Sequence, residues 1–286
     1  MMASPDRPGP ADADREAVRA LSGIPATLTI PLAARAAASR RDNPIITDPA
    51  AEDLTARLGL HPDRKDSKRA AVEVGTAVRT ELLDQATERF AHAHPGATVV
   101  TLGAGLCTRF ARLSGLDVRW ADVDLPEVAA VRAALLPAGE NRVIVAGSVL
   151  DSGWKDAVDV SSGQPVLFIL EGLLMYFTAD QARSLITGLA DEFPGSDLAV
   201  EAIGTMMIRQ SSRRQPASVT DVGARFTWGV QDFATVAAWH PRLHLAATWY
   251  LFDYHRDRWS PQLRAMRHIP YLRAQSKVGY FHIGPA

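Results

Sequence analysis

The spacing of apolar residues divides the chain into two parts at about residue 93. From residue 13 to about residue 92 only helical patterns occur, and prolines break them into short segments. These prolines are Pro25, Pro31, Pro44 and Pro49. We therefore predict an N-terminal helical cap over residues 13–92, preceded by a disordered tail over residues 1–12, which are polar and rich in proline.

The strongest helical pattern covers roughly residues 67–92. Apolar residues recur there every four positions, which places them along one face of a helix. They are Val74, Val78, Leu82, Ala86 and Phe90. The sequence HPGA that follows predicts the end of this helix, because proline and glycine both interrupt helical structure.

Beyond residue 93 the pattern alternates between strands and helices. Pro126 lies in the first turn of one connecting helix, and Thr178 is the predicted N-terminal cap of another. Such alternation predicts an α/β fold, in which helices cover both faces of a mostly parallel, seven-stranded sheet. Five strands are predicted at 97–102, 117–124, 141–147, 165–172 and 197–204, and a terminal antiparallel pair at 243–250 and 278–284.

The stretch from residue 204 to residue 229, GTMMIRQSSRRQPASVTDVGARFTWG, breaks this alternation. We predict that it is an insertion over the carboxyl edge of the sheet, after the fifth strand. It would begin a lid that reaches to about residue 242 within a core over residues 93–286.

The composition is that of an ordinary globular protein of one elaborated domain, with 286 residues, 47% of them hydrophobic, and a net charge of -1. This charge does not favour nucleic acid as a partner. Because Cys107 is the only cysteine, an intrachain disulfide and a cysteine-based metal site are excluded, and no metal is expected. The first residues are unlike a signal peptide and no apolar run approaches the length of a membrane span. We expect a cytoplasmic protein, either a monomer or a homodimer.

The sequence VVTLGAGLCTR, at residues 99–109, predicts a glycine turn between a strand and a helix. Gly103 and Gly105 would let a ligand approach the backbone N–H groups there. A dinucleotide fingerprint requires a third glycine at the position of Thr108, and no Gly-Lys-Ser/Thr follows for a triphosphate. A nucleoside without a pyrophosphate therefore fits better, although a turn that binds no ligand remains an alternative.

Acidic residues at the ends of two predicted strands extend this hypothesis. Asp124 follows the turn by roughly 20 residues, where a carboxylate binds both hydroxyls of a ribose. Asp122 is the alternative on the same strand, and either could instead favour the start of the next helix. Glu171 ends the apolar run PVLFIL and needs a cationic partner, either a ligand or Arg79.

The ordered motifs AVRTELLD, VVTLGAGLCTRFARL, WADVDLPEV, FILEGLLMYFT and LAVEAIG resemble the leucine carboxyl methyltransferase family, in particular its bacterial branch of polyketide-tailoring O-methyltransferases. The similarity extends from about Thr27 to Gly204. It implies a class I methyltransferase (Rossmann-like) fold and S-adenosylmethionine as the cofactor. Two positions depart from the family pattern: Cys107 replaces a usual aspartate, and Ser148 replaces the usual adenine-contacting aspartate.

The resemblance also implies roles for single residues. Arg79 would bind the methionine carboxylate of the cofactor, and Glu171 would lie near its amino group. Asp124 would hold the ribose hydroxyls, and the hydroxyl of Ser148 would accept a hydrogen bond from the adenine amine. The complete set predicted for the cofactor is Arg79, Gly103, Ala104, Gly105, Asp124, Leu125, Ser148, Val149 and Glu171.

The methyl acceptor is predicted from the absence of an obvious base. No histidine lies between His94 and His240, so the core would suit a carboxylate acceptor, which is already ionised at pH 7. A phenolic hydroxyl is the alternative. We expect the acceptor to be a small molecule or peptide bound between the cap and the insertion, where Tyr176 is the candidate substrate-facing residue.

The sequence does not decide the roles of two further groups of side chains, nor does it exclude two other functions. Arg209, Arg213 and Arg214 could attract an acidic acceptor or could simply face solvent. His240, His244 and His255 are interpreted as surface or packing residues. A nicotinamide-dependent oxidoreductase and a catalytically inactive cofactor-binding protein are the rival functions.

Overall fold

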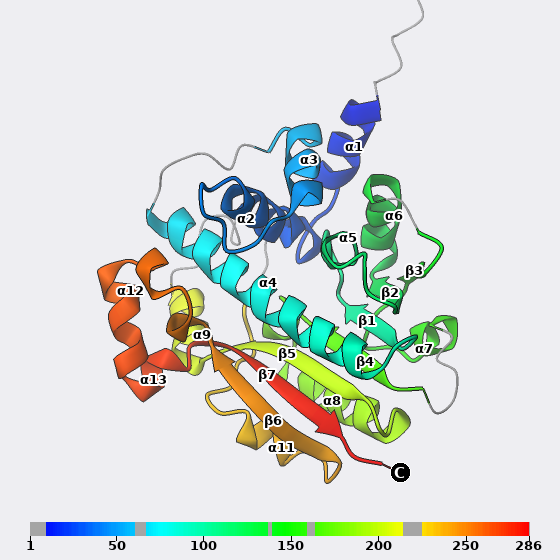
Figure 1. Ribbon diagram of the computed structural model, residues 1–286, viewed down its shortest axis with the longest axis vertical. Helices are drawn as coiled ribbons and strands as arrows, with labels where there is room; N and C mark the ends of the chain where they lie inside the picture. The colour runs from blue at the N-terminus through cyan, green and yellow to red at the C-terminus, as the bar shows by residue number, and fades with distance from the viewer. Residues whose placement is uncertain (1–9, 61–66, 137–138, 159–163, 214–224, 286) are drawn as a thin grey trace, which may run out of the picture.

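The structure is a computed structural model with a central sheet surrounded by helices (Figure 1). It describes residues 10–60, 67–136, 139–158, 164–213 and 225–285. The N-terminal helices lie on one side of the long helix α4, and the strands of the sheet lie beneath it (Figure 1). None of the described helices is both long enough and apolar enough to cross a membrane.

All seven predicted strands are confirmed, with bounds that differ from the prediction by at most two residues. They are β1 (Thr98–Leu102), β2 (Arg119–Asp124), β3 (Arg142–Ala146), β4 (Val166–Leu170), β5 (Asp197–Ile203), β6 (Leu243–Tyr250) and β7 (Ser276–Ile283). Their order in the sheet is β3-β2-β1-β4-β5-β7-β6. Strand β7 runs antiparallel to both β5 and β6, and the remaining pairs are parallel.

The central strands are buried on both faces, and most of their residues are apolar. Val99, Leu167 and Ile169 pack on the side of α4 (Ser67–Ala93). Their neighbours Val100 and Phe168 point to the opposite face and pack with α8 (Ala179–Glu192). The carboxyl ends of the parallel strands therefore meet at one edge of a sheet whose central strands are covered on both faces.

The main connecting helices form as predicted. In α4, Val78, Leu82, Ala86 and Phe90 are all buried, which confirms the apolar stripe. Helix α6 (Pro126–Leu135) begins at the expected proline. Helix α8 has a full capping box, in which the Thr178 side chain accepts from the Gln181 N–H and the Gln181 side chain accepts from the Thr178 N–H.

Three elements of the N-terminal region pack against the glycine turn. Leu28 and Leu32 of η1 and α2, and Leu54 of α3, form an apolar cluster with Leu106 of the turn and Val128 of α6. The helices before α4 are α1 (Pro10–Arg19), η1 (Pro25–Leu28), α2 (Thr29–Ser39) and α3 (Pro49–Arg57). Helix α1 begins three residues earlier than the expected start at residue 13.

Two regions differ from the sequence expectation. The helix predicted directly after the glycine turn is only four residues long, α5 (Arg109–Arg112). The segment between β6 and β7 had no prediction, yet it forms a series of short turns. These are η3 (Leu251–Asp253), η4 (Arg256–Arg258), α12 (Pro261–Ala265), η5 (Met266–His268) and α13 (Pro270–Arg273). Each is too short to give a periodic pattern.

The predicted insertion after β5 starts with helix α9 (Thr205–Arg213). The Gln275 side chain fixes the first turn of α9, because its Oε1 accepts from the N–H groups of Met206 and Met207 at 3.0 and 3.2 Å. Residues 214–224 lie outside the described residues. Beyond them the Val230 N–H donates to the Ile203 carbonyl at the end of β5, and the chain then forms α11 (Ala234–Ala237). Helix α9 is thereby held next to the carboxyl ends of the strands.

Candidate active site

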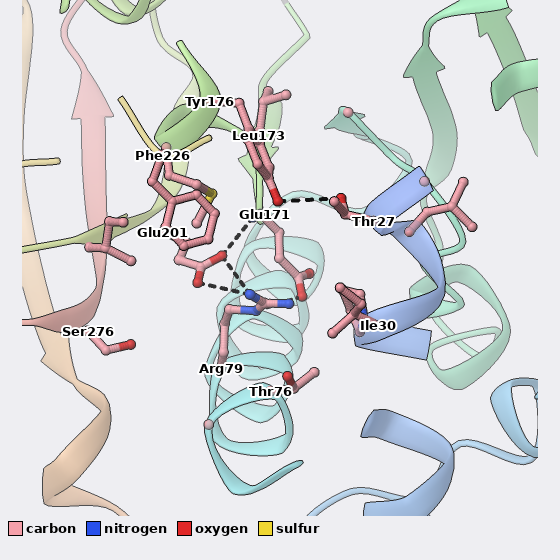
Figure 2. A pocket seen from close by; sticks show the side chains of 18 of the residues that line it. Thr27, Ile30, Thr76, Arg79, Glu171, Leu173, Tyr176, Glu201, Phe226 and Ser276 are labelled. Atoms are coloured by element: carbon pink, nitrogen blue, oxygen red, sulfur yellow. Dashed lines mark hydrogen bonds and ion pairs between the residues drawn. The ribbon is translucent and has the colours of Figure 1, made fainter. Parts of the chain in front are cut away.

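A cavity of about 850 Å³ lies at the carboxyl edge of the sheet. The loops that follow β1, β2, β3 and β4 line it, together with the cap, the long helix α4, the start of α9 and the turns before β7. Figure 2 shows Thr27 and Ile30 of the cap opposite Arg79 of α4. Every residue predicted for the site from the sequence lines this cavity. They are Arg79, Gly103, Ala104, Gly105, Asp124, Leu125, Ser148, Val149, Glu171 and Tyr176.

The glycine turn after β1 has the backbone conformation that its glycines permit. Gly103 and Gly105 have φ values of +72° and +48°, in the left-handed region that disfavours other residues. A Cβ atom on Gly103 would lie 2.8 Å from a methyl carbon of Leu173, so the Leu173 side chain would have to move to admit it. The turn is held against β2, because the N–H groups of Gly103 and Ala104 both donate to the Val123 carbonyl.

The two aspartates of β2 have different surroundings. Asp122 is 3% exposed and accepts from Arg132 and Arg142 at 2.8 and 2.7 Å, away from the cavity. Asp124 lines the cavity, and its carboxylate accepts from the Gly105 N–H at 2.6 Å and the Leu125 N–H at 2.8 Å. Burial raises the pKa of Asp124, although these two N–H groups partly offset the rise.

Ser148 and Val149 follow β3 at the far end of the same wall. The Ser148 hydroxyl oxygen accepts from the Leu150 N–H at 3.2 Å, which fixes the turn that leads away from the strand. Leu125, Val149 and Leu150 supply apolar surface beside it. This end of the cavity thus combines a flat apolar wall with one hydroxyl group.

Arg79 occupies the middle of the cavity between two carboxylates (Figure 2). Its Nε donates to Glu171 at 3.0 Å, and its Nη1 contacts both oxygens of Glu201 at 2.9 Å. Burial alone would raise the pKa of Glu171, but Arg79 and Arg109 hold it well below its usual range. The sequence left open whether Arg79 pairs with Glu171, and the structure contains that pair.

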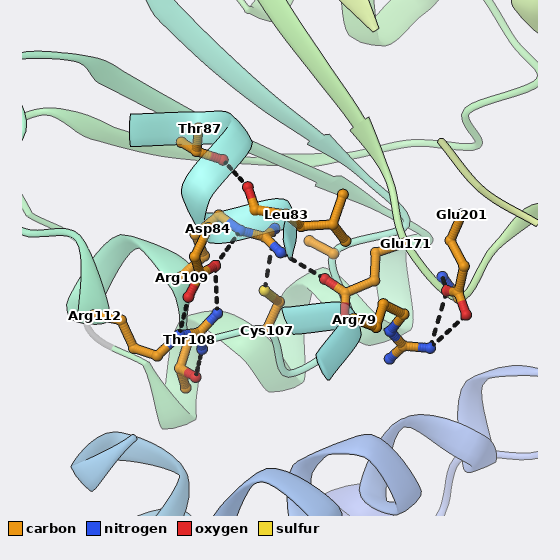
Figure 3. A network of polar contacts seen from close by, with 12 residues as sticks. Arg79, Leu83, Asp84, Thr87, Cys107, Thr108, Arg109, Arg112, Glu171 and Glu201 are labelled. Atoms are coloured by element: carbon orange, nitrogen blue, oxygen red, sulfur yellow. Dashed lines mark hydrogen bonds and ion pairs between the residues drawn. The ribbon is translucent and has the colours of Figure 1, made fainter. Parts of the chain in front are cut away.

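The Arg79–Glu171 pair belongs to a longer buried chain of alternating charges (Figure 3). Adjacent members are joined by hydrogen-bonded ion pairs of 2.7 to 3.0 Å. In order, the members are Glu201, Arg79, Glu171, Arg109, Asp84, Arg112, Asp48 and Arg35. Four arginines balance four carboxylates, so the chain carries no net charge.

Cys107, one of the two departures from the family pattern, borders this chain. Nη1 of Arg109 donates to its sulfur at 3.7 Å (Figure 3). The thiol also lines the cavity. It thus faces the same arginine that holds Glu171.

Tyr176 also lines the cavity, from the turn η2 (Leu174–Tyr176). Its hydroxyl donates to Thr27 of the cap at 3.4 Å (Figure 2). The centroids of the Tyr176 and Phe226 rings lie 5.4 Å apart in an edge-to-face arrangement. Burial raises the pKa of Tyr176, so its hydroxyl is protonated at neutral pH. The surrounding lining is apolar and rich in thioethers and aromatic rings: Met175, Phe177, Ile203, Met206, Met207, Phe252, Trp259 and Met266.

The three histidines and the arginine cluster lie elsewhere. His240 contacts Asp191 and His255 contacts Glu81, and neither these two nor His244 lines the cavity. Arg209 lies on α9 but is not part of the cavity wall. The Arg213 side chain and Arg214 lie outside the described residues. Among the described residues, no group of histidine, cysteine and acidic side chains could hold a metal ion.

Sequence reasoning missed Glu201 and gave Arg109 no role. Glu201 is 5% exposed and Arg109 1% exposed, although both are charged. A signal for Glu201 was present, because it follows the apolar run LAV just as Glu171 follows PVLFIL. Two carboxylates at the ends of neighbouring buried strands require cations between them.

Comparison with known proteins adds to this geometry. The sequence profile described as leucine carboxyl methyltransferase matches residues 29–190, more than half of the 286 residues. The chain belongs to the leucine carboxyl methyltransferase family. It is therefore an S-adenosylmethionine-dependent methyltransferase, and the alternative of a nicotinamide-dependent oxidoreductase falls away.

Two relatives are similar over most of the chain. TcmP of Streptomyces glaucescens, a tetracenomycin polyketide synthesis O-methyltransferase, is 29% identical over 88% of this chain and 94% of its own. The dpfgK protein of Gibberella zeae, an S-adenosylmethionine-dependent methyltransferase, is 29% identical over 74% of this chain and 77% of its own.

Solved structures confirm the fold. A candidate methyltransferase from Thermobifida fusca superposes with a TM-score of 0.60 at 14% identity, covering 98% of this chain and 100% of that one. Magnesium protoporphyrin IX methyltransferase of Synechocystis, solved with bound S-adenosylhomocysteine, superposes with a TM-score of 0.51 at 11% identity, covering 80% and 93%. The seven-stranded sheet is thus the class I methyltransferase fold that the sequence predicted.

We predict that Glu171→Gln lowers the free energy of unfolding by about 3 kcal/mol at pH 7, because it leaves two buried arginines short of a carboxylate. The pKa of Glu171 is depressed in the folded state, so its ionised form stabilises the fold above the ordinary value of about 4.3. This contribution is lost as the pH falls below that value. Urea unfolding from pH 7 to pH 3 should therefore show the difference between wild type and variant shrinking.

Glu140→Gln, at an exposed turn, is the matched control and should change stability little at any pH. A difference between wild type and Glu171→Gln that stays constant across the pH range would contradict the ion-pair account.

Proposed function

We propose that this methyltransferase transfers the methyl group of S-adenosylmethionine to a carboxylate oxygen of a small, largely apolar natural product. The observation that carries the proposal is the single cavity. Its lining combines the glycine turn, Asp124 and Arg79, here called the polar end, with thioethers, aromatic rings and Tyr176, here called the apolar end. A polar nucleoside and an apolar acceptor would therefore meet in one enclosed space.

The residues of the polar end match the chemical groups of the cofactor one by one. The guanidinium of Arg79 suits a carboxylate, and the carboxylate of Glu171 suits an ammonium. The Asp124 carboxylate suits a vicinal diol, and the turn from Gly103 to Gly105 lets the backbone approach closely. Leu125, Val149 and Ser148 offer a flat apolar wall and one hydroxyl for adenine. When bound, S-adenosylmethionine supplies a methyl group on a sulfonium.

We infer that the rest of the chain encloses the acceptor. Residues 13–92 would act as the cap, through Thr27 and Ile30, and residues 204–242 as the lid, through Met206 and Met207. Enclosure by both would exclude water and hold the acceptor oxygen near the reacting methyl group. Such positioning contributes several kcal/mol, on the order of a thousandfold or more in rate.

The choice of a carboxylate rests on the protonation states of the lining residues. No histidine lines the described part of the cavity. Glu171 is too weak a base, because its pKa lies well below the usual range, and the Tyr176 hydroxyl stays protonated. A carboxylate acceptor has a pKa near 4 and arrives ionised at pH 7, whereas a phenol, with a pKa near 10, would need a base.

A phenolic hydroxyl is the second candidate acceptor. The aromatic side chains Phe226, Phe252 and Trp259 favour a flat ring system in the apolar end. The relative TcmP is described as an O-methyltransferase of polyketide synthesis, which supports an acceptor of polyketide type. A polyketide ring system can carry either a carboxylate or a phenolic hydroxyl, so the two candidates differ only in the group that is methylated.

Asp124→Asn should weaken S-adenosylhomocysteine binding by about 1.5–3 kcal/mol, the value of hydrogen bonds to a charged group. Asp122→Asn on the same strand is the comparison: it should lower stability and weaken binding less than Asp124→Asn, because Asp122 reaches the glycine turn only through Arg132. Calorimetric titration and urea unfolding of both variants measure the two effects. If Asp124→Asn lowers stability without weakening binding, the Asp124 carboxylate only stabilises the glycine turn and the start of α6.

The acceptor is tested with matched pairs of aromatic compounds, each a carboxylic acid beside the phenol of the same ring system. Mass spectrometry should detect the gain of one methylene in the acids, at a rate that is flat from about pH 6 to pH 9. Methylation of the phenols alone, at a rate that rises with pH, would establish the second candidate. Binding of the cofactor without methylation of any member would place the acceptor outside both of these classes.

A further inference from the structure

Glu201 is a carboxylate of the cavity lining to which neither the sequence motifs nor the proposed function assigns a role. It lies near the carboxyl end of β5 and begins the alternating chain of charges. Both of its oxygens contact Nη1 of Arg79 at 2.9 Å, and one also accepts from the Gly172 N–H at 2.6 Å (Figure 2). A single carboxylate therefore contacts Arg79 and the residue that directly follows Glu171.

The contact with Arg79 fixes the orientation of its guanidinium. Arginine presents five N–H donors in one plane, and Glu171 and Glu201 together engage Nε and Nη1. None of the described residues accepts a hydrogen bond from Nη2. The two carboxylates thus set the plane of the group and leave its third nitrogen for a ligand in the cavity.

The contact with Gly172 fixes the turn that carries Glu171. Gly172 has a φ value of +65°, and the chain reverses there between β4 and η2. The hydrogen bond to the Gly172 N–H holds the backbone next to Glu171. It therefore also fixes the point from which the Glu171 side chain enters the cavity. A change at Glu201 would disturb Arg79 and Glu171 together.

We propose that Glu201 is a positioning residue for the amino-acid half of S-adenosylmethionine. It acts through Arg79 and the Gly172 turn, and it leaves the nucleoside half to the glycine turn and Asp124. This inference rests on the proposed function, because it takes Arg79 and Glu171 as the groups that bind the amino-acid end. It predicts that loss of Glu201 weakens only ligands that carry this end.

The test compares two ligands by calorimetric titration: S-adenosylhomocysteine, and 5′-methylthioadenosine, which lacks the amino-acid group. Glu201→Gln should raise the dissociation constant of S-adenosylhomocysteine about tenfold, because glutamine has one acceptor oxygen and no charge. The dissociation constant of 5′-methylthioadenosine should change by less than about twofold, well under the tenfold that corresponds to 1.4 kcal/mol.

Asp197→Asn provides the matched control on the same strand. Asp197 is also a buried carboxylate of β5, but its partners are Tyr280 and His282, away from the cavity. This variant should leave the ratio of the two affinities unchanged. If Glu201→Gln does not fold, Glu201→Asp keeps the charge opposite Arg79 but shortens the side chain, and it should show the same selective loss.

Equal weakening of both ligands, or no weakening of S-adenosylhomocysteine, would overturn the role of Glu201. The proposed function fails separately. If wild-type protein binds neither ligand, the cofactor site itself is wrong and this inference falls with it. If Arg79→Ala loses S-adenosylhomocysteine while Glu201→Gln retains it, the function stands and only the role of Glu201 is refuted.

Discussion

The buried chain of alternating charges from Glu201 to Arg35 is the constraint on which the rest of the molecule depends. Each inner member contacts two groups of opposite charge, which offsets the cost of removing it from water. The chain joins the end of β5, the long helix α4, the short helix α5 and the cap. These elements are far apart in the sequence, and the charges are neutralised only when all of them are in place.

The chain ends at the glycine turn, because Arg35 donates to the Leu106 carbonyl at 2.7 Å. The same turn is held from the other side by Arg132, which donates to the Gly105 carbonyl at 2.8 Å. Arg132 is in turn held by Asp122. The glycine turn, which must bind a nucleoside, is thus fixed by two buried arginines. Arg35 comes from the cap and Arg132 from α6. The two aspartates of β2 consequently have different roles: Asp122 holds the buried arginines, and Asp124 lines the cavity.

The fold was largely predictable because its signals are local. Alternating apolar runs gave all seven strands, and the stripe through Val78 and Leu82 gave the long helix. The family motifs then placed ten residues around one cavity. What remained hidden depends on contacts between distant segments. The partners of Glu201 lie 122 and 29 residues away, and the turns from residue 251 to residue 273, which supply Trp259 and Met266 to the acceptor end, have no periodic pattern.

The most direct measurement of the central claim is a crystal structure of the protein with S-adenosylhomocysteine. The account predicts that the ligand carboxylate contacts Nη2 of Arg79 while Glu171 and Glu201 keep their contacts with that arginine. It also predicts the ribose hydroxyls on Asp124. A ligand bound with its carboxylate away from Arg79, or a chain of charges broken and re-paired around it, would contradict the account.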